Sequence, residues 1–180
     1  MQAFLAPLTE LAEYQDIQKG RRKGEGLIQI AGCVNSQKTH LMYALGDGFE
    51  YRVIAFSSEE KAKKAYEEYR FLTEDVYLYP ARDLLFYYAD IKGKVLTGRR
   101  MEVLRALIEK EPGSPLTVIT TMDAFLDGIS APDEIRKRRI SLRSGDELDF
   151  SEFQSELSGM GYERESQIEG PGQFAVRGGI

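Results

Sequence analysis

The chain has 180 residues, of which 42% are hydrophobic, and it carries a formal net charge of -5. This size allows one domain, or one and a half, with a real hydrophobic core, and the lack of a long apolar run argues against a membrane-spanning helix. The acidic balance argues against non-specific nucleic-acid binding as the main task, because neutralising phosphates requires clustered lysines and arginines.

The scarcity of cysteine and histidine narrows the possible chemistry. Cys33 is the one cysteine and His40 the one histidine. A lone cysteine cannot form an internal disulfide and fits a reducing compartment, so we expect a cytoplasmic protein. One histidine argues against a histidine-based metal site and against a Ser-His-Asp triad, so we expect neither a metal site nor a catalytic residue.

Helices and strands alternate over the first part of the chain. Four apolar runs predict strands, at residues 27–32, 51–56, 75–80 and 116–122. Four stretches predict helices, at residues 4–18, 40–48, 57–72 and 95–110. This alternation predicts an α/β fold with a mostly parallel sheet, flanking helices and right-handed crossovers. The first run, LIQIAG, has the composition of a buried strand.

The alternation of predicted strands and helices ends near residue 130, where we place a domain boundary. Residues 1–130 form the α/β unit. Residues 131–180 have the pattern of the start of a small α+β domain, with a helix at 150–162 and a strand at 173–180. This second unit is too small to be stable alone, and the chain stops inside the predicted strand, so we expect a truncated piece of a longer protein.

The stretch IAGCVNSQKTH, residues 30–40, is similar to a phosphate-binding loop with one residue changed. Such a loop has the pattern G-x-x-x-x-G-K-[ST] between a buried strand and a helix. Gly32 fits the first position and Lys38-Thr39 fit the last two, but Gln37 replaces the second glycine. A working loop cradles phosphates with its backbone N–H groups, and a side chain at that glycine obstructs the conformation it needs.

Two interpretations of this loop are open. A nucleotide site would also need an acid at the end of an apolar strand, and Asp123 is the best candidate, although the strand does not run straight into it. In the alternative, Lys38 and Thr39 simply open a helix after a tight turn. The missing glycine favours the second interpretation, so we predict a degenerate, inactive loop and no cofactor for this chain.

Two other groups of residues could contact nucleic acid. The basic run at 136–139, Arg-Lys-Arg-Arg, could bind phosphates, but such a run beside acidic residues is more often a solvated linker. The aromatic residues between 77 and 88 could stack on bases, although such residues more often pack a core or a domain interface.

The last segment contains two arginines that could dock a protein. Arg164 and Arg177 flank a Gly-Pro-Gly turn, as in the two arms of a hairpin. A hairpin can bring both onto one exposed face, and arginine forks bind carboxylates well, which predicts a protein-docking patch. The alternative is two solvated surface arginines.

Three stretches together resemble a known family: YPARDLLFYYADIKGKVLTGRRMEVLRALI, VITTMDAFLDG and GYERESQIEGPGQFAVRGGI. They cover most of residues 75–180 and look like the N-terminal region of bacterial transcription-repair coupling factor. That region is similar in turn to the first domains of the excinuclease protein UvrB. The family is a large DNA translocase that removes RNA polymerase stalled at a lesion and recruits a second excinuclease protein, UvrA.

The resemblance implies a helicase half-domain that has lost its ATP site, followed by the start of an inserted domain that docks UvrA. In UvrB the matching loop is a complete Gly-Lys-Thr, so Gln37 would make Lys38 and Thr39 remnants. IKGKVLTG also leaves no room for the DNA-gripping hairpin of UvrB. ATP, magnesium, RNA polymerase and DNA would then be bound by later domains that this chain lacks.

The resemblance also implies docking residues. A Tyr-x-Arg stretch of UvrB that contacts UvrA matches here at Arg164. A Phe-Arg-x-Arg-Gly stretch matches from Phe174, with Ala175 in place of one arginine and Arg177 at the other. We therefore expect Arg164 and Arg177 to carry docking, with Phe174 and Gln173 as neighbours. The chain is interpreted as a non-catalytic docking module, and the alternative is a nucleotide- or DNA-binding helicase fragment.

Overall fold

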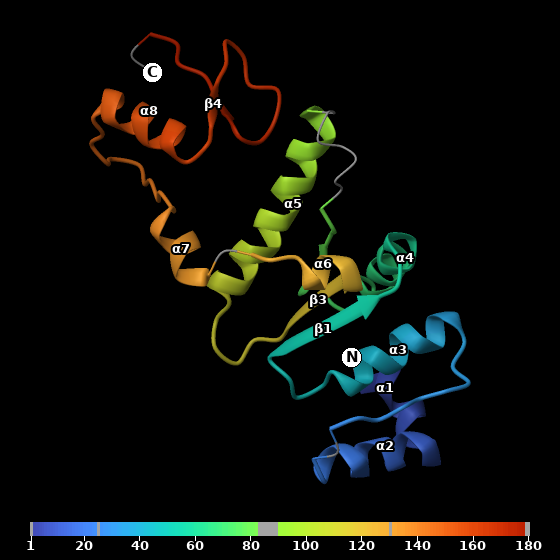
Figure 1. Ribbon diagram of the computed structural model, residues 1–180. Coiled ribbons are helices and arrows are strands. Elements are labelled where there is room, and N and C mark those ends of the chain that lie inside the picture. The colour runs from blue at the N-terminus through green and yellow to red at the C-terminus, as the bar shows by residue number, and fades with distance from the viewer. Residues whose placement is uncertain (1, 25, 83–89, 130, 179–180) are drawn as a thin grey trace. The chain divides into compact units, whose positions relative to one another are not determined.

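The computed structural model describes residues 2–24, 26–82, 90–129 and 131–178 (Figure 1). The chain forms two compact units. The first contains Met1–Leu78 and Glu111–Met122, and the second contains Tyr79–Lys110 and Asp123–Ile180. The predicted boundary near residue 130 falls inside the second unit and stays a prediction.

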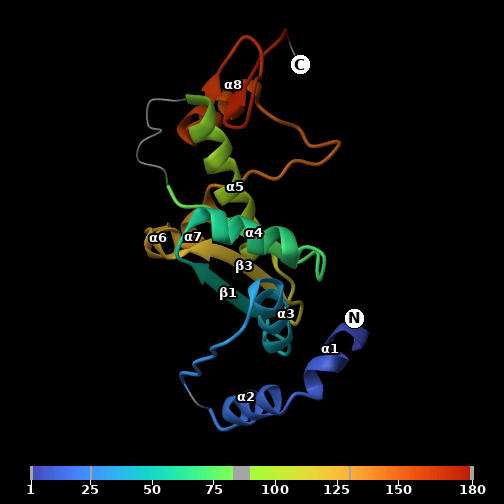
Figure 2. The ribbon, with the colours of Figure 1, turned by 90° about the vertical axis from the view of Figure 1, so that its right-hand side faces the viewer.

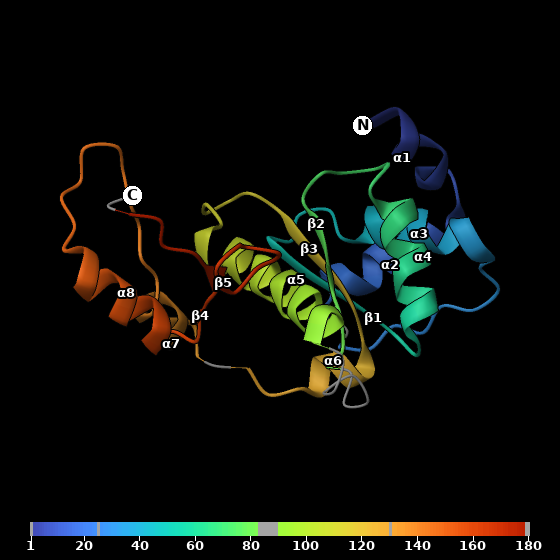
Figure 3. The same cartoon turned by 90° about the horizontal axis from the view of Figure 1, so that it is seen from above.

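The first unit combines helices with a small sheet. Its helices are α1 (Gln2–Thr9), α2 (Ala12–Arg22), α3 (Asn35–Leu45) and α4 (Glu59–Tyr69). Its strands are β1 (Tyr51–Phe56), β2 (Val76–Tyr79) and β3 (Leu116–Thr121). The strand order is β1-β3-β2, with β2 beside β3 in Figure 3. The β1–β3 pair is parallel along its length, from Tyr51 opposite Leu116 to Phe56 opposite Thr121.

Helix α4 shows how the sequence builds one of these elements. The Ser58 Oγ atom accepts a hydrogen bond from the Lys61 N–H at 3.4 Å, which caps the first turn. Ala62, Ala65 and Tyr69 follow at helical spacing, and all three are buried. The helix therefore packs one face against the sheet, and Figure 2 shows it running alongside β1 and β3.

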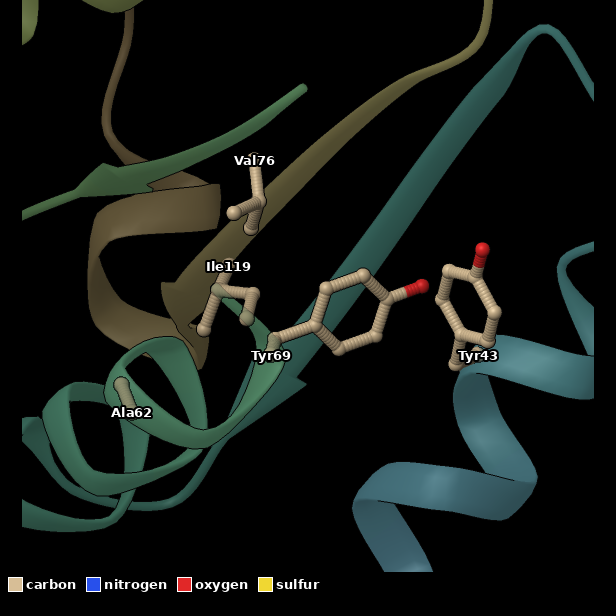
Figure 4. Packing of buried hydrophobic residues seen from close by; sticks show 5 residues of the cluster. All are labelled: Tyr43, Ala62, Tyr69, Val76 and Ile119. Atoms are coloured by element: carbon tan, nitrogen blue, oxygen red, sulfur yellow. The ribbon is translucent and has the colours of Figure 1, made fainter. Parts of the chain in front are cut away.

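The core of the first unit lies between α3, α4 and the sheet. Its buried cluster consists of Tyr43, Ala62, Tyr69, Val76 and Ile119 (Figure 4). The Tyr43 and Tyr69 rings meet edge to face, with centroids 5.6 Å apart. Every residue of β3 is buried, which is why a β-branched run occupies this central strand.

Three predicted strands are confirmed, and one is wrong. The runs at 51–56, 75–80 and 116–122 form β1, β2 and β3, except that Met122 begins a helix. Residues 27–32 form no strand, and the side chain of Leu27 is 89% exposed. An apolar run becomes a strand only where it finds a ladder partner and a face to bury, and this segment has neither among the described residues.

The predicted helix at 4–18 is two helices, because the chain breaks at Glu10 and Leu11. The Thr9 hydroxyl donates to the Ala6 carbonyl at 2.7 Å, and the Gln15 side chain donates to the Thr9 carbonyl at 3.0 Å. These bonds take up carbonyl groups that a continuous helix would use. The predicted helices at 40–48 and 95–110 begin earlier, at Asn35 in α3 and Asp90 in α5 (Asp90–Glu109).

The second unit consists of helices and a two-stranded sheet. Its helices are α5, α6 (Met122–Leu126), α7 (Pro132–Lys137) and α8 (Phe150–Gly159), and its strands are β4 (Glu163–Arg164) and β5 (Gln173–Phe174). The helix predicted at 150–162 is confirmed as α8. Its Asp149 cap accepts hydrogen bonds from the N–H groups of Ser151 and Glu152, both at 2.9 Å.

The structure confirms the α/β class, with a small parallel sheet and helices. In the part of the chain that the structure describes, no helix is both long and apolar enough to cross a membrane.

Candidate functional site

The predicted phosphate loop bends at Gly32. Residues 26–34 form no helix or strand, and Gly32 has a φ angle of 85°. A Cβ atom at Gly32 would meet no other atom within 4 Å. This glycine is therefore required for its left-handed backbone conformation and not for space.

Gln37, the residue that departs from the phosphate-loop pattern, bonds to the backbone of its own helix turn. Its Oε1 atom accepts a hydrogen bond from the Val34 N–H at 3.3 Å. Val34 is the residue directly before α3, so Gln37 supplies one half of a capping box. The glutamine thus serves the start of the helix.

Thr39 connects two helices. Its side chain is buried, and its hydroxyl donates to the Glu68 carboxylate of α4 at 2.7 Å. A hydrogen bond to a charged acceptor is among the stronger ones in proteins. Lys38, by contrast, is exposed. The hydroxyl that would bind magnesium in a working loop is therefore engaged within the protein.

The predicted acid, Asp123, and a second acidic pair at Glu59 and Glu60 show no arrangement suited to a metal. Asp123 is exposed in the first turn of α6. Glu59 and Glu60 occupy the first turn of α4, where carboxylates are favoured by the helix dipole. Among the described residues, no three side chains of the types His, Cys, Asp and Glu are grouped to hold a metal ion.

The predicted C-terminal hairpin is wrong, because β4 and β5 are parallel. Glu163 pairs with Gln173 and Arg164 with Phe174. The Glu163 N–H donates to the Gly172 carbonyl, and the Glu165 N–H donates to the Phe174 carbonyl, both at 2.9 Å. The chain between the strands therefore runs back before β5 begins, instead of turning directly as a hairpin does.

Gln173 and Phe174 hold this segment together. The Gln173 Oε1 atom accepts hydrogen bonds from the N–H groups of Glu169 and Gly170, at 2.8 and 3.1 Å. These bonds fix the turn that brings the chain back. The Phe174 side chain is 9% exposed. Both residues were predicted as docking neighbours, and the structure gives each of them internal contacts.

Arg164 and Arg177 are both exposed. Neither guanidinium has an ion pair or a hydrogen bond with a described residue. Arg164 lies on β4 in register with Phe174, whereas Arg177 follows β5 in a segment without regular structure. The described contacts therefore bring the two arginines into the same small segment without joining them.

The basic run at 136–139 is largely ion-paired within the protein. Arg136 pairs with Asp133 at 2.9 Å and Lys137 with Glu134 at 3.1 Å. Arg139 pairs with Glu109 at 2.8 Å. These pairs favour the interpretation as a solvated linker. Of the aromatic candidates, Tyr77 and Tyr79 lie on β2 and Tyr79 is buried, while residues 86–88 lie outside the described part of the chain.

A buried arginine in the second unit could not be foreseen from a local motif. The Arg100 Nη1 atom donates to the Pro80 carbonyl and to the Asp127 carboxylate, both at 2.9 Å. Its guanidinium lies 4.3 Å from the centre of the Tyr79 ring. Desolvation acts to raise the pKa of Asp127, but hydrogen bonds from Arg100 and from the Arg82 N–H outweigh it and lower that pKa.

The C-terminal part of the chain matches a protein family. Residues 140–180 match the family model described as UvrB interaction domain. A longer stretch is similar to curated proteins named transcription-repair-coupling factor. The identity is 33% over 107 residues in Staphylococcus haemolyticus (strain JCSC1435), 30% over 106 residues in Staphylococcus epidermidis (strain ATCC 12228 / FDA PCI 1200) and 30% over 108 residues in Staphylococcus aureus (strain USA300).

The resemblance to transcription-repair coupling factors is confirmed. Each of these alignments covers 59% of this chain. The chain spans about 9% of the length of these relatives. The matched interaction domain contains all four predicted docking residues.

Proposed function

We propose that this chain is a non-catalytic module of a transcription-repair coupling factor and that it docks the excinuclease protein UvrA. The observation that carries the proposal is the match of residues 140–180 to the UvrB interaction domain. In the full protein, docking would recruit nucleotide excision repair to RNA polymerase stalled at a lesion. RNA polymerase, the DNA on which the motor moves, and the ATP and magnesium that the motor uses would be bound by other domains.

The exposure of the two arginines supports this role. Arg164 and Arg177 are exposed, and the described part of the chain offers neither guanidinium an ion pair. Such a guanidinium can form a two-pronged hydrogen bond with a carboxylate of a partner. Removing one member of a buried charge pair at an interface typically costs about 2–5 kcal/mol. Losing either contact should therefore weaken binding markedly, in part because the partner's carboxylate would be left buried without its guanidinium.

The internal contacts of Gln173 and Phe174 suggest different roles within the segment. Phe174 anchors the segment by burial, and Gln173 fixes the turn before β5. Arg164 and Arg177 then present charge to the partner from this frame. We propose that the first two residues position the docking surface and that the two arginines contact UvrA.

Calorimetric titration of purified UvrA with this chain tests the proposal. The double variant Arg164→Ala, Arg177→Ala should abolish the binding that the wild type shows. The matched control is Arg99→Ala, Arg138→Ala, which removes the same charge from exposed residues outside the matched domain. Circular dichroism should show the same fold for all three proteins. Absence of binding by a folded wild type, or equal losses in both double variants, would contradict the proposal.

We also propose that the phosphate-like loop binds no nucleotide. Gln37 caps the helix, and the Thr39 hydroxyl is engaged by Glu68. A fluorescent ATP analogue with magnesium should therefore give the same result with the wild type and with Lys38→Ala. A saturable signal lost in Lys38→Ala would revive the alternative of a nucleotide-binding helicase fragment.

A further inference from the structure

An open cavity of about 380 Å³ lies in the first unit, and none of its lining residues belongs to the phosphate-like loop. It is lined by Gln18, Arg21, Arg22, Asp47 and Phe49. This volume falls in the range of small-molecule sites, roughly 300 to 1,000 Å³. The lining combines an aromatic ring, two cations, a carboxylate and an amide.

Arg21 lines this cavity, and hydrogen bonds hold its side chain in place. Its Nη1 and Nη2 atoms donate to the carbonyl groups of Leu45 and Asp47, at 2.8 and 3.0 Å. These carbonyls lie at the C-terminal end of α3, where a positive charge is favourable. The guanidinium lies 4.7 Å from the centre of the Phe49 ring. The phenyl ring is thus stacked on a cation and held in place.

Phe49 still presents surface to solvent, because 51% of the residue is exposed. A planar base could stack on this open surface, as bases do on aromatic side chains in single-strand binding proteins. Arg21 behind the ring adds a cationic contribution to such a stack. The ring therefore offers a platform for one planar, polarisable group.

Arg22 supplies the charge for a phosphate. It is exposed, and the described residues offer it no ion pair, whereas Lys19 pairs with Asp16 at 2.9 Å. The Gln18 amide nitrogen donates to the Tyr14 hydroxyl at 2.9 Å, which leaves its carbonyl oxygen as an acceptor. Acceptors of this kind suit the N–H groups of a base edge.

We propose that this cavity binds one nucleotide unit, with the base on Phe49 and the phosphate at Arg22. This nucleotide unit belongs either to a single strand of nucleic acid or to a free nucleotide. The Asp47 carboxylate would repel a bare polyanion but can accept a hydrogen bond from a base. The site therefore combines stacking with one phosphate contact, and it is compatible with a net charge of -5.

Fluorescence anisotropy of a short labelled oligothymidylate at low salt tests the site. The variant Arg22→Ala should weaken binding about tenfold, and Phe49→Leu by a similar factor, since stacking on one side chain contributes roughly 5- to 150-fold. Phe49→Tyr, which keeps the ring, should bind like the wild type. Arg99→Ala is the charge-matched control, because it removes an exposed arginine in the second unit, outside the basic run at 136–139.

Competition with unlabelled thymidine monophosphate separates the two sources. Displacement only by the oligonucleotide indicates a nucleic-acid strand, and equal displacement by both indicates a free nucleotide. The proposal is overturned if no ligand gives saturable binding to the folded protein. It is also overturned if Phe49→Leu binds like the wild type, because charge alone would then explain the signal. Arg22→Ala and Lys38→Ala separate this site from the phosphate-like loop in the ATP-analogue titration.

Discussion

In the phosphate-like loop Gln37 and Thr39 bond to the protein itself, whereas in the proposed docking segment, residues 163–177, the two arginines have no bonding partner among the described residues. Gln37 bonds to the Val34 N–H and Thr39 bonds to Glu68. Arg164 and Arg177 are exposed. Both segments carry residues of a known functional pattern, but the loop has its glutamine and its threonine engaged, whereas the docking segment leaves both of its arginines available to another molecule.

This difference provides a physical criterion for judging a degenerate motif. A side chain engaged inside the fold contributes to stability, and its loss should lower the free energy of unfolding. An exposed side chain without a partner contributes little to stability, and its loss should lower only the affinity for a partner. The two segments should therefore respond oppositely when stability and binding are measured on the same variants.

The largest effect is expected for binding by the single arginine variants. Arg164→Ala and Arg177→Ala should each weaken binding to UvrA by about 2 kcal/mol or more, which is roughly 30-fold in Kd. Neither variant should change the free energy of unfolding by more than about 0.5 kcal/mol. Calorimetry and urea unfolding measure the two quantities. If either variant unfolds at a much lower urea concentration than the wild type, that arginine contributes to the stability of the fold, and the proposed difference between the two segments is contradicted.

Thr39→Val should give the opposite result. The variant keeps the shape of the side chain but leaves the Glu68 carboxylate without its donor, which should cost about 2 kcal/mol of stability. Binding to UvrA should not change. Thr39→Ser keeps the hydroxyl and serves as the control in the same urea titration. Equal stability of Thr39→Val and the wild type would mean that water replaces the bond to Glu68.

The Arg100–Asp127 ion pair should make the stability of the protein depend on pH. The folded pKa of Asp127 is lowered, so its contribution to stability is present above the unfolded pKa, about 3.9, and is lost as the pH falls through the folded pKa. Asp127→Asn keeps an acceptor for Arg100 and should cost about 1.5 kcal/mol at neutral pH. The difference from the wild type should shrink on acidification. A constant difference across this range in urea titrations would show that Asp127 is not the titrating group.

The elements that could be predicted from sequence are those whose surroundings follow from the local pattern. The β-branched run of β3 is buried along its whole length, and the Ser58 cap starts α4 as expected. The run at 27–32 has the same apolar character, but composition does not show whether a neighbouring strand is available, and Leu27 is exposed. Strand pairing is a tertiary property, so that prediction failed.

The motif predicted a docking segment near the C-terminal end of the sequence, but the topology of that segment was not predictable. A Gly-Pro-Gly turn favours a hairpin locally. The direction of β5 depends instead on Gln173, whose side chain binds two N–H groups earlier in the chain. In the same way, the partner of Arg100 is Asp127, 27 residues further along. Contacts of this kind follow from the fold and leave no local signal.

The smallest predicted effect tests whether the phosphate-like loop is inactive because of one residue. Gln37→Gly restores the missing glycine of the phosphate-loop pattern and removes the side chain that caps Val34. It should cost about 1 kcal/mol of stability, from the lost cap and from the greater freedom of glycine in a helix. It should bind an ATP analogue no better than the wild type does, because the Thr39 hydroxyl stays bonded to Glu68. Gln37→Ala removes the same cap without adding the glycine, so comparing the two by urea unfolding separates the contributions. If Gln37→Gly alone gained saturable nucleotide binding, the glutamine would be the sole block, and the bond between Thr39 and Glu68 would have to yield to magnesium.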